Sequence, residues 1–483
     1  MIHSRPARTR ARTPVNRRFA VLWLLVLLGL MSLADAGSAA AHGISQNADL
    51  ELAATFGGNE LTFALRQVPR VPGPFQVDVI AHDPVRAATL TLSLVPLEGA
   101  PPSTPSRAVI RLRAGRPGSS PTTLTADRTG PWELDVSNGT DTARLPFRVL
   151  TPRAAPWEKV VYPAFLVAGV LLLGVLAASV LHRRGAALLM SGGTVVTLTV
   201  ALTAALLSPD MTAASPNGAP DEKLLTNVDG TTANGRSFTD LALRTVPARP
   251  TAGSVFALHL GLTDGSDGQP VDDLAVHHGA LAHTVVTSAD LKYFAHLHPV
   301  PDGPGDLLLR LSLPRPGRYL VQTEIDRVDS GSQLLTATLD LGVHIGSPDG
   351  TSAVPSVDTP RESRVTLSPA RPTAGVATEI SLHVGTSAAP ARDLQGWLGM
   401  AGHMIVRRRD DDFFGHAHET SSMAALSAPG AIVPDETVGQ YGPLLHFVFA
   451  FPRAGRYQVW IQYERDFRIH TAAFTVDVTG DTP

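Results

Sequence analysis

The chain has 483 residues, a formal net charge of −3 and no cysteine, but it carries 17 histidines. Without thiols it cannot form disulfides, thiolate-ligated zinc sites, iron–sulfur clusters or a blue-copper centre. The near-neutral charge provides no basic field for a polyanion, so we expect no nucleic-acid partner. Any transition metal would have to be bound by histidine, methionine or carboxylate groups.

The N-terminal segment, residues 1–41, has the features of a cleaved secretory signal peptide. Six arginines precede an apolar run at residues 19–31, and an alanine-rich cleavage motif ends at Ala41. The run is shorter than the roughly 20 residues that a membrane span needs, although a retained anchor is the alternative. Cleavage would make His42 the N-terminus, where its α-amino group and imidazole could chelate copper with His82 as a third donor.

Two apolar segments in the middle of the chain, at about 160–181 and 186–207, are each long enough to span a membrane. They are joined by a short basic loop with the sequence His-Arg-Arg-Gly, which the positive-inside rule assigns to the cytoplasm. We therefore predict a transmembrane helical hairpin over residues 156–207, with a soluble core hairpin as the alternative. The lipid bilayer is then a partner, and the protein is a multi-pass cell-membrane protein with its other domains on the extracytoplasmic side.

The rest of the chain predicts β-structure. Short stretches rich in Val, Leu, Thr and aromatic residues alternate with Pro and Gly clusters. The predicted fold class is all-β, with three β-sandwich domains of immunoglobulin-like or cupredoxin-like type and one transmembrane α-helical hairpin. The domains are predicted at 42–155, 236–346 and 361–483, with linkers at 208–235 and 347–360.

The second and third predicted domains are two copies of one repeat. The string Ala-Arg-Pro-Thr-Ala-Gly occurs at 248–253 and again at 370–375. A later turn and strand end at Tyr319 in the first copy and at Tyr457 in the second, so the second copy is longer by a loop assigned to residues 421–440. Three histidines recur at a spacing of 120 positions: His283, His296 and His298 in the first copy, and His403, His416 and His418 in the second.

The spacing of these histidines predicts a metal site in each copy. Residues i and i+2 of a strand share a face, so each His-x-His unit presents two imidazoles side by side. The third histidine lies thirteen residues upstream, at the distance expected for the neighbouring strand of a hairpin. Three imidazoles on two strands suit Cu(II) or Zn(II). The alternative is that the histidines are half-buried and hydrogen-bonded only to each other or to the backbone.

Weaker candidates lie around the second set. Met400 and Met404 flank His403, and their thioethers would favour Cu(I), so copper is the predicted cofactor and zinc the alternative. Their other possible role is ordinary packing. His446 could join the second set or face solvent.

Two resemblances accompany these motifs. Residues 130–136 and 145–149 echo the last strands of the second repeat, and the first domain resembles the YtkA-like family of extracytoplasmic β-sandwich modules. The Phe-x-His-x-His unit followed by a Pro-x-x-Gly-x-Tyr strand resembles repeats of bacterial secreted proteins described as heavy-metal-binding or copper-associated. The second copy departs from this pattern at Glu419, where the first has Pro299, and in its long loop. The resemblance implies metal handling without catalysis.

The sequence contains no Gly-rich phosphate loop, nucleophile elbow or His-Glu-x-x-His motif, so we expect no enzymatic activity. It predicts a membrane-anchored extracytoplasmic protein that sequesters copper or delivers it to another metal-handling envelope protein. The alternative is a non-catalytic structural or interaction protein of the cell envelope in which the histidines are incidental.

Overall fold

A computed structural model describes most of the chain between residues 50 and 480. The chain divides into two compact units, one with residues 1–46 and 153–214 and one with residues 47–152 and 215–483. The predicted signal segment, His42 and both predicted linkers lie outside the described residues. The described ranges are 50–66, 71–99, 105–149, 158–206, 238–328, 330–343, 363–426 and 433–480.

The first unit contains two long helices, α2 (Glu158–Val180) and α3 (Arg184–Leu206). Each has 23 residues, or about 34 Å of helix, which is long and apolar enough to cross a membrane. The helices contact each other where a glycine of one faces a long side chain of the other, Gly174 with Met190 and Gly193 with Leu171. Small residues at such points let two apolar helices approach closely. The two predicted apolar helices are confirmed.

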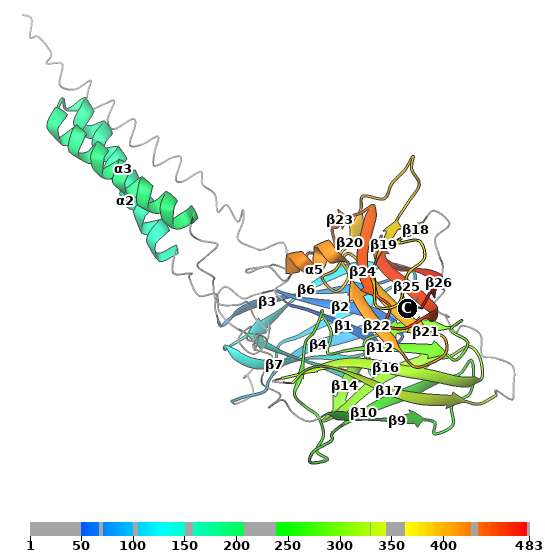
Figure 1. The fold of residues 1–483 in the computed structure, drawn as a ribbon. Helices are drawn as coiled ribbons and strands as arrows, with labels where there is room; N and C mark the ends of the chain where they lie inside the picture. The colour runs from blue at the N-terminus through cyan, green and yellow to red at the C-terminus, as the bar shows by residue number, and fades with distance from the viewer. Residues whose placement is uncertain are drawn as a thin grey trace, which may run out of the picture. The chain divides into compact units, whose positions relative to one another are not determined.

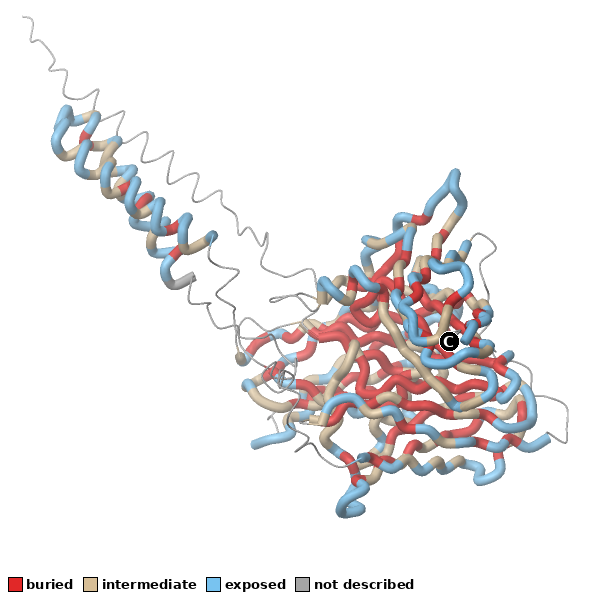
Figure 2. The backbone as a smooth tube through the Cα atoms, in the orientation of Figure 1, coloured by how far each residue is buried: buried red, intermediate tan, exposed pale blue. Residues whose placement is uncertain are grey.

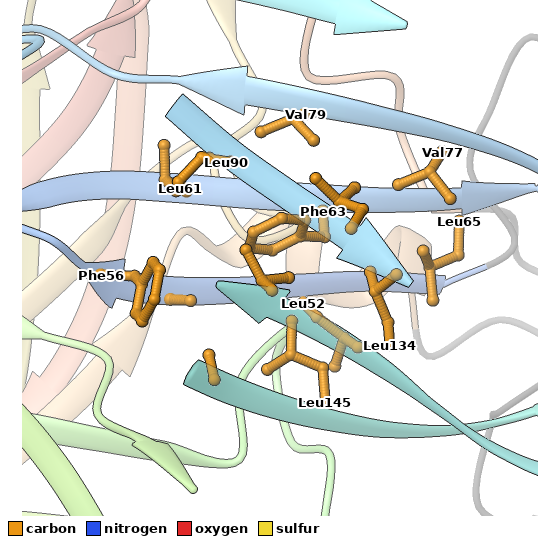
Figure 3. Packing of buried hydrophobic residues seen from close by; sticks show 14 of the residues in the cluster. Leu52, Phe56, Leu61, Phe63, Leu65, Val77, Val79, Leu90, Leu134 and Leu145 are labelled. Carbon is orange, nitrogen blue, oxygen red and sulfur yellow. The ribbon is translucent and has the colours of Figure 1, made fainter. Parts of the chain in front are cut away.

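The N-terminal part of the second unit forms two antiparallel sheets, in the orders β1-β2-β3-β6 and β5-β4-β7-β8. Alternate residues of both sheets point into one hydrophobic core, to which Leu52 and Phe63 contribute from the first sheet and Leu90 and Leu134 from the second (Figure 3). The strands are β1 (Leu50–Phe56), β2 (Asn59–Arg66), β3 (Gly73–Ala81), β4 (Ala88–Pro96), β5 (Arg107–Leu112), β6 (Gly118–Ala126), β7 (Gly130–Ser137) and β8 (Thr142–Val149).

The first repeat contributes two more sheets around its own core, in the orders β14-β15-β10-β9 and β11-β16-β12-β13, with β17 paired to β16. Its strands are β9 (Thr239–Val246), β10 (Val255–Asp264), β11 (Leu274–Ala275), β12 (Ala282–Ser288), β13 (Phe294–Leu297), β14 (Val300–Gly303), β15 (Asp306–Ser312), β16 (Gly317–Arg327) and β17 (Gly331–Leu341).

The second repeat has the same plan, with sheets β18-β19-β24 and β22-β21-β25-β20-β23 and with β26 paired to β25. The extra residues of this copy lie between β22 and β24, where α5 and β23 are found. Its elements are β18 (Arg364–Ser368), β19 (Ala377–His383), β20 (Leu394–Gln395), β21 (His403–Arg408), β22 (Phe414–His418), α5 (Thr420–Leu426), β23 (Gly439–Tyr441), β24 (Leu444–Ala450), β25 (Gly455–Arg465) and β26 (Arg468–Val478).

The two repeats pack against each other through their histidine-bearing sheets, so that β21 and β22 lie beside β12 and β16 (Figure 1). A small hydrophobic cluster joins them, in which Phe294 stacks on Trp460 with ring centroids 4.6 Å apart. Arg407 of the second repeat donates hydrogen bonds to Thr287 and Gln322 of the first. Buried residues run along β12 and β21 in this region, as the burial map shows (Figure 2). The predicted dominance of β-structure is confirmed.

The edge strand β1 of the N-terminal sheets also reaches the first repeat through its backbone. The amide of Ala53 donates to the carbonyl of Gly279, and the amide of Thr55 donates to the carbonyl of His298, each at 2.7 Å. An edge strand has unpaired backbone groups, and here they are satisfied by the chain around the first histidine set. The N-terminal sheets therefore hold one side of the candidate site.

Candidate metal centre

The strand pairing brings each predicted set of three histidines together. In the first repeat Val285 of β12 pairs with His296 of β13, and in the second His403 of β21 pairs with His418 of β22. His283 lies two residues from Val285, and His298 lies two residues from His296. His416 lies two residues from His418. All three histidines of each set therefore lie on the same face of their hairpin. Within each set, one ring nitrogen from every histidine lies within 4.8 Å of the others.

The two sets also face each other across the contact between the repeats. The ring of His416 lies 5.6 Å from the rings of both His283 and His296, and His403 lies 6.2 Å from His296, measured between centroids. We call this group the six-histidine centre, with a first triad of His283, His296 and His298 and a second triad of His403, His416 and His418. The sequence indicated one set per repeat but gave no signal that the sets would meet.

Most of the centre is withdrawn from water. His298 and His403 are fully buried, and His283 is 2% exposed. Burial, reinforced by the neighbouring imidazoles, lowers the pKa of His283, His296 and His403 well below the usual value. These rings are therefore neutral at pH 7, and each has one nitrogen with a free lone pair.

Backbone carbonyls fix which nitrogen carries the proton in one histidine of each triad. His283 Nε2 lies 3.0 Å from the carbonyl oxygen of His277, and His403 Nε2 lies 3.0 Å from that of Trp397. A carbonyl oxygen can only accept, so Nε2 must donate in both rings. The lone pair of each neutral ring then lies on Nδ1, which faces the interior of the centre.

Side chains from the opposite repeat fix a second histidine of each triad. His296 Nδ1 donates to Gln462 Oε1 at 2.9 Å, and His416 Nδ1 donates to Glu324 Oε2 at 2.6 Å. Gln462 and Glu324 occupy equivalent positions of the two repeats, so the contact is reciprocal, as in a two-fold dimer. In a neutral ring, this donation leaves the lone pair on Nε2.

With these four tautomers, the nitrogen atoms that carry lone pairs face each other in both triads. His283 Nδ1 lies 3.2 Å from His296 Nε2, and His403 Nδ1 lies 3.3 Å from His416 Nε2. With the protons held on the outer nitrogens, neither contact can be a hydrogen bond between neutral rings. The remaining inner nitrogens, Nε2 of His298 and of His418, are buried and have no hydrogen-bond partner in the described part of the chain.

The two triads differ at their outer sides. Glu60 of strand β2 accepts a hydrogen bond from His298 Nδ1 at 2.5 Å, so the N-terminal sheets close the first triad. At the second triad the ring of His278 lies 4.0 Å from that of His418. The His277-His278 pair is visible in the sequence, but the second repeat has Trp397-Leu398 there, which hid its relation to the repeated histidines.

The weaker candidates lie elsewhere. Met404 is fully buried in the hydrophobic core on the opposite face of β21, and Met400 is buried in the tight turn at residues 397–400. His446 lies on β24, in the other sheet of its repeat, and contacts Ser381 at 3.1 Å. The predicted thioether donors are therefore packing residues in this structure.

His82 belongs to a separate buried group, which we call the His82 cluster: His82, Glu51, Glu436 and Glu464. His82 Nδ1 lies 2.7 Å from Glu464 Oε1 and its Nε2 lies 4.0 Å from Glu436 Oε2. Burial alone would lower the pKa of His82, but the carboxylates of Glu464 and Glu436 outweigh it and raise the pKa to about 9. Burial raises the pKa of Glu436 to about 7 and that of Glu51 well above its usual value.

A further group in the described residues joins His259 to Asp302 and Asp306 at the surface of the first repeat. Asp306 accepts hydrogen bonds from His259 at 2.9 Å and from Arg244 at 3.2 Å. Its charge is thus already balanced by a cationic side chain, and we assign it no metal.

Comparison with known proteins gives one family match. The model of a family described as a domain of unknown function (DUF8832) matches residues 240–343 and 356–480, one segment in each repeat. No curated protein matches the chain.

Several solved structures are similar at low identity. They include the Escherichia coli adhesin FdeC (10% identity, TM-score 0.16, 85% of this chain and 94% of that one) and the FN1–FN3 domains of chicken CNTN1 (8%, 0.17, 86% and 97%). A red sea bream transglutaminase is similar at 12% identity and a TM-score of 0.15 over 50% of this chain, which spans only 32% of the transglutaminase. At such TM-scores these similarities bear on neither fold nor function.

Proposed function

We propose that the chain is a membrane-anchored extracytoplasmic protein that binds transition-metal ions in its six-histidine centre. The observation that carries this proposal is the pair of close contacts between unprotonated nitrogens, His283 with His296 and His403 with His416. A cation between the two nitrogens of each pair turns a repulsive contact into a pair of coordinate bonds.

The distances suit such an ion. Two ligands bonded at 2.0 to 2.1 Å in a tetrahedral arrangement are separated by about 3.3 Å. The observed nitrogen separations of 3.2 and 3.3 Å match this value. His298 and His418 supply a third nitrogen to each triad, and the outer acceptors Glu324 and Gln462 hold two of the rings in the orientation that metal ligands require.

An all-imidazole donor set suits both Cu(II) and Zn(II). Of these we propose copper, with zinc as the alternative, held for sequestration or for delivery to another metal-handling envelope protein rather than for catalysis. Burial of four of the six ligands supports a holding role, because it limits the access of a substrate to the bound ion.

The same proposal includes the architecture around the centre. Helices α2 and α3 would form the transmembrane hairpin, and the paired sheets would form three β-sandwich domains on the extracytoplasmic side, the first of them YtkA-like. The cores of the N-terminal sheets and of each repeat support this division.

Titration of the purified full chain in detergent with Cu(II) and Zn(II) tests the proposal. We expect two ions per chain for the wild type and none at comparable affinity for His296→Ala/His416→Ala, which removes one ligand from each triad. His383→Ala/His446→Ala, two histidines outside the centre, serves as the matched control and should bind like the wild type. Unchanged stoichiometry in the first variant would mean that the histidines are ordinary interface residues.

A further inference from the structure

A row of histidine rings leads from the surface of the first repeat to the second triad. The rings of His277 and His278 lie 3.8 Å apart, those of His278 and His418 lie 4.0 Å apart, and those of His418 and His416 lie 4.6 Å apart. Each step is short enough for a metal ion to be held by two successive rings at once.

Exposure falls along this row. The side chain of His277 is 40% exposed, His278 and His418 are half-buried, and the side chain of His416 is 4% exposed. An ion arriving from solvent would meet His277 first and would exchange water for imidazole at each step. It would therefore never be left without ligands between solvent and the buried centre.

The surroundings of the outermost ring, His277, favour the binding of a cation. His277 Nδ1 lies 2.7 Å from Asp326 Oδ2, so Nδ1–H donates a hydrogen bond to the carboxylate and the lone pair on Nε2 is available to bind a metal ion. Asp326 itself is 5% exposed, and its negative charge beside the ring attracts a cation. At the inner end, Nε2 of His418 is buried and has no partner among the described residues.

Among the described residues, the first triad has no such row. At the positions equivalent to His277 and His278 the second repeat carries Trp397 and Leu398, both 1% exposed, and the ring of Trp397 packs against His296 and His298. Both turns have the same backbone, with φ of 45° at His278 and 55° at Leu398. The difference between the triads is thus one of side chains and not of turn shape.

We propose that His277 and His278 form the entry site through which metal ions reach the six-histidine centre, by transfer to His418. This inference rests on the proposed function and adds a route to it. In each transfer one imidazole–metal bond forms as another breaks, and no electron moves. The ligand class is a divalent transition-metal ion such as Cu(II).

The test compares uptake and release of Cu(II) by the full chain in detergent, followed by stopped-flow absorption and by transfer to excess chelator. The variant is His277→Ala/His278→Leu, since leucine already occupies the equivalent position of the second repeat with the same backbone. We expect uptake and release to slow equally, by about tenfold, as for a barrier raised by about 1.4 kcal/mol. Stoichiometry and Kd should not change, and His383→Ala, outside the row, should match the wild type.

Other outcomes overturn the inference in distinct ways. Unchanged rates would mean that metal enters elsewhere. Faster release with a weaker Kd would make His278 a permanent ligand of the second triad and not an entry site. If the wild type itself takes up no Cu(II), the proposed function fails. If the wild type takes up Cu(II) and the variant does so at the same rate, only the entry site is wrong.

Discussion

The six-histidine centre and the His82 cluster are both buried groups of ionisable side chains. Both lie where parts of the second unit, which contains the sheets, meet. The first lies between the two repeats and contains only imidazoles, three of which, His283, His296 and His403, have pKa values lowered by burial. The second joins the N-terminal sheets to the second repeat through three carboxyl groups and one imidazole whose pKa is raised to about 9.

The two groups avoid uncompensated buried charge in opposite ways. The His82 cluster holds protons, which leaves a cationic His82 beside Glu464 and raises the pKa of Glu51 and Glu436. The six-histidine centre loses protons and is left with lone pairs that face each other. In the first kind of site an ion pair and bound protons limit the buried charge, whereas in the second kind a cation would bind to the lone pairs under the proposed function.

The largest effect should come from opening the contact between the repeats. Trp460→Ala removes the ring stacked on Phe294 and should lower the free energy of unfolding by about 3 to 5 kcal/mol. It should also weaken metal binding, because the same contact holds the triads together. Trp132→Ala, in the N-terminal core, is the control: it should cost similar stability in denaturant unfolding and leave Kd unchanged. Equal losses of affinity in both variants would contradict a specific role for the interface.

Acid should destabilise the metal-free protein through the six-histidine centre. The pKa values of His283, His296 and His403 are lowered in the folded state, so below about pH 6.5 the unfolded chain takes up protons that the folded chain does not. The free energy of unfolding should then fall by about 1.4 kcal/mol per pH unit for each such histidine. Urea titrations of metal-free protein at pH 7.5 and 5.5 measure this.

The matched variant is His283→Gln/His403→Gln, which keeps polar groups at both positions but removes two of the titrating rings. Its stability should depend less steeply on pH over the same interval. An identical slope in wild type and variant would show that other groups cause the acid sensitivity.

Alkali should act on the His82 cluster with the opposite sign. Since the pKa of His82 is raised to about 9, its stabilising effect is complete below about pH 6.5 and is lost as the pH rises through 9. The contribution of His82 to this loss should reach about 3 kcal/mol by pH 10 in the wild type and be removed in His82→Asn, where the raised pKa of Glu51 still makes stability fall as the pH rises. Unfolding by urea at pH 7 and 10 distinguishes the two. His283, His296 and His403 contribute little slope here, because their lowered pKa values keep them neutral in the folded chain and an unfolded imidazole is mostly neutral above pH 7.

The sequence predicted the elements and the local histidine geometry well, because both follow from short-range patterns. Alternation and turn residues defined the strands, and the spacing of His283 and His296 matched a hairpin that the pairing of β12 with β13 confirms. The two apolar helices were equally plain from their length.

What the sequence could not supply depends on contacts between distant segments. Glu60 reaches His298 from 238 positions away, and Gln462 reaches His296 from 166 positions away. Neither carries a local motif, so no periodicity reveals it. Strand alternation already placed Met404 on the opposite face of β21 from His403. Its closeness to His403 in the sequence nevertheless suggested a metal ligand, whereas the structure packs Met404 in the hydrophobic core.

The smallest effects should come from the outer hydrogen-bond acceptors. Substituting these acceptors one at a time should affect metal binding at one triad and not at the other. Glu324→Gln gives His416 the same amide partner that Gln462 already provides for His296, and it should weaken metal binding at the second triad by about 10-fold to 100-fold. Glu60→Gln should weaken the first triad to a similar degree, since Glu60 holds His298. Chelator competition resolves the two steps of binding.

Glu379→Gln, an exposed carboxylate on β19, is the matched control for loss of one negative charge. If all three variants weaken both binding steps alike, the effect is one of overall charge and the acceptors do not orient the rings. If Glu324→Gln and Glu60→Gln each affect a different step, the two triads hold separate ions, and the N-terminal sheets contribute to one site while the first repeat contributes to the other. We expect separate effects on the two binding steps, because Glu60 contacts a histidine of the first triad and Glu324 contacts a histidine of the second.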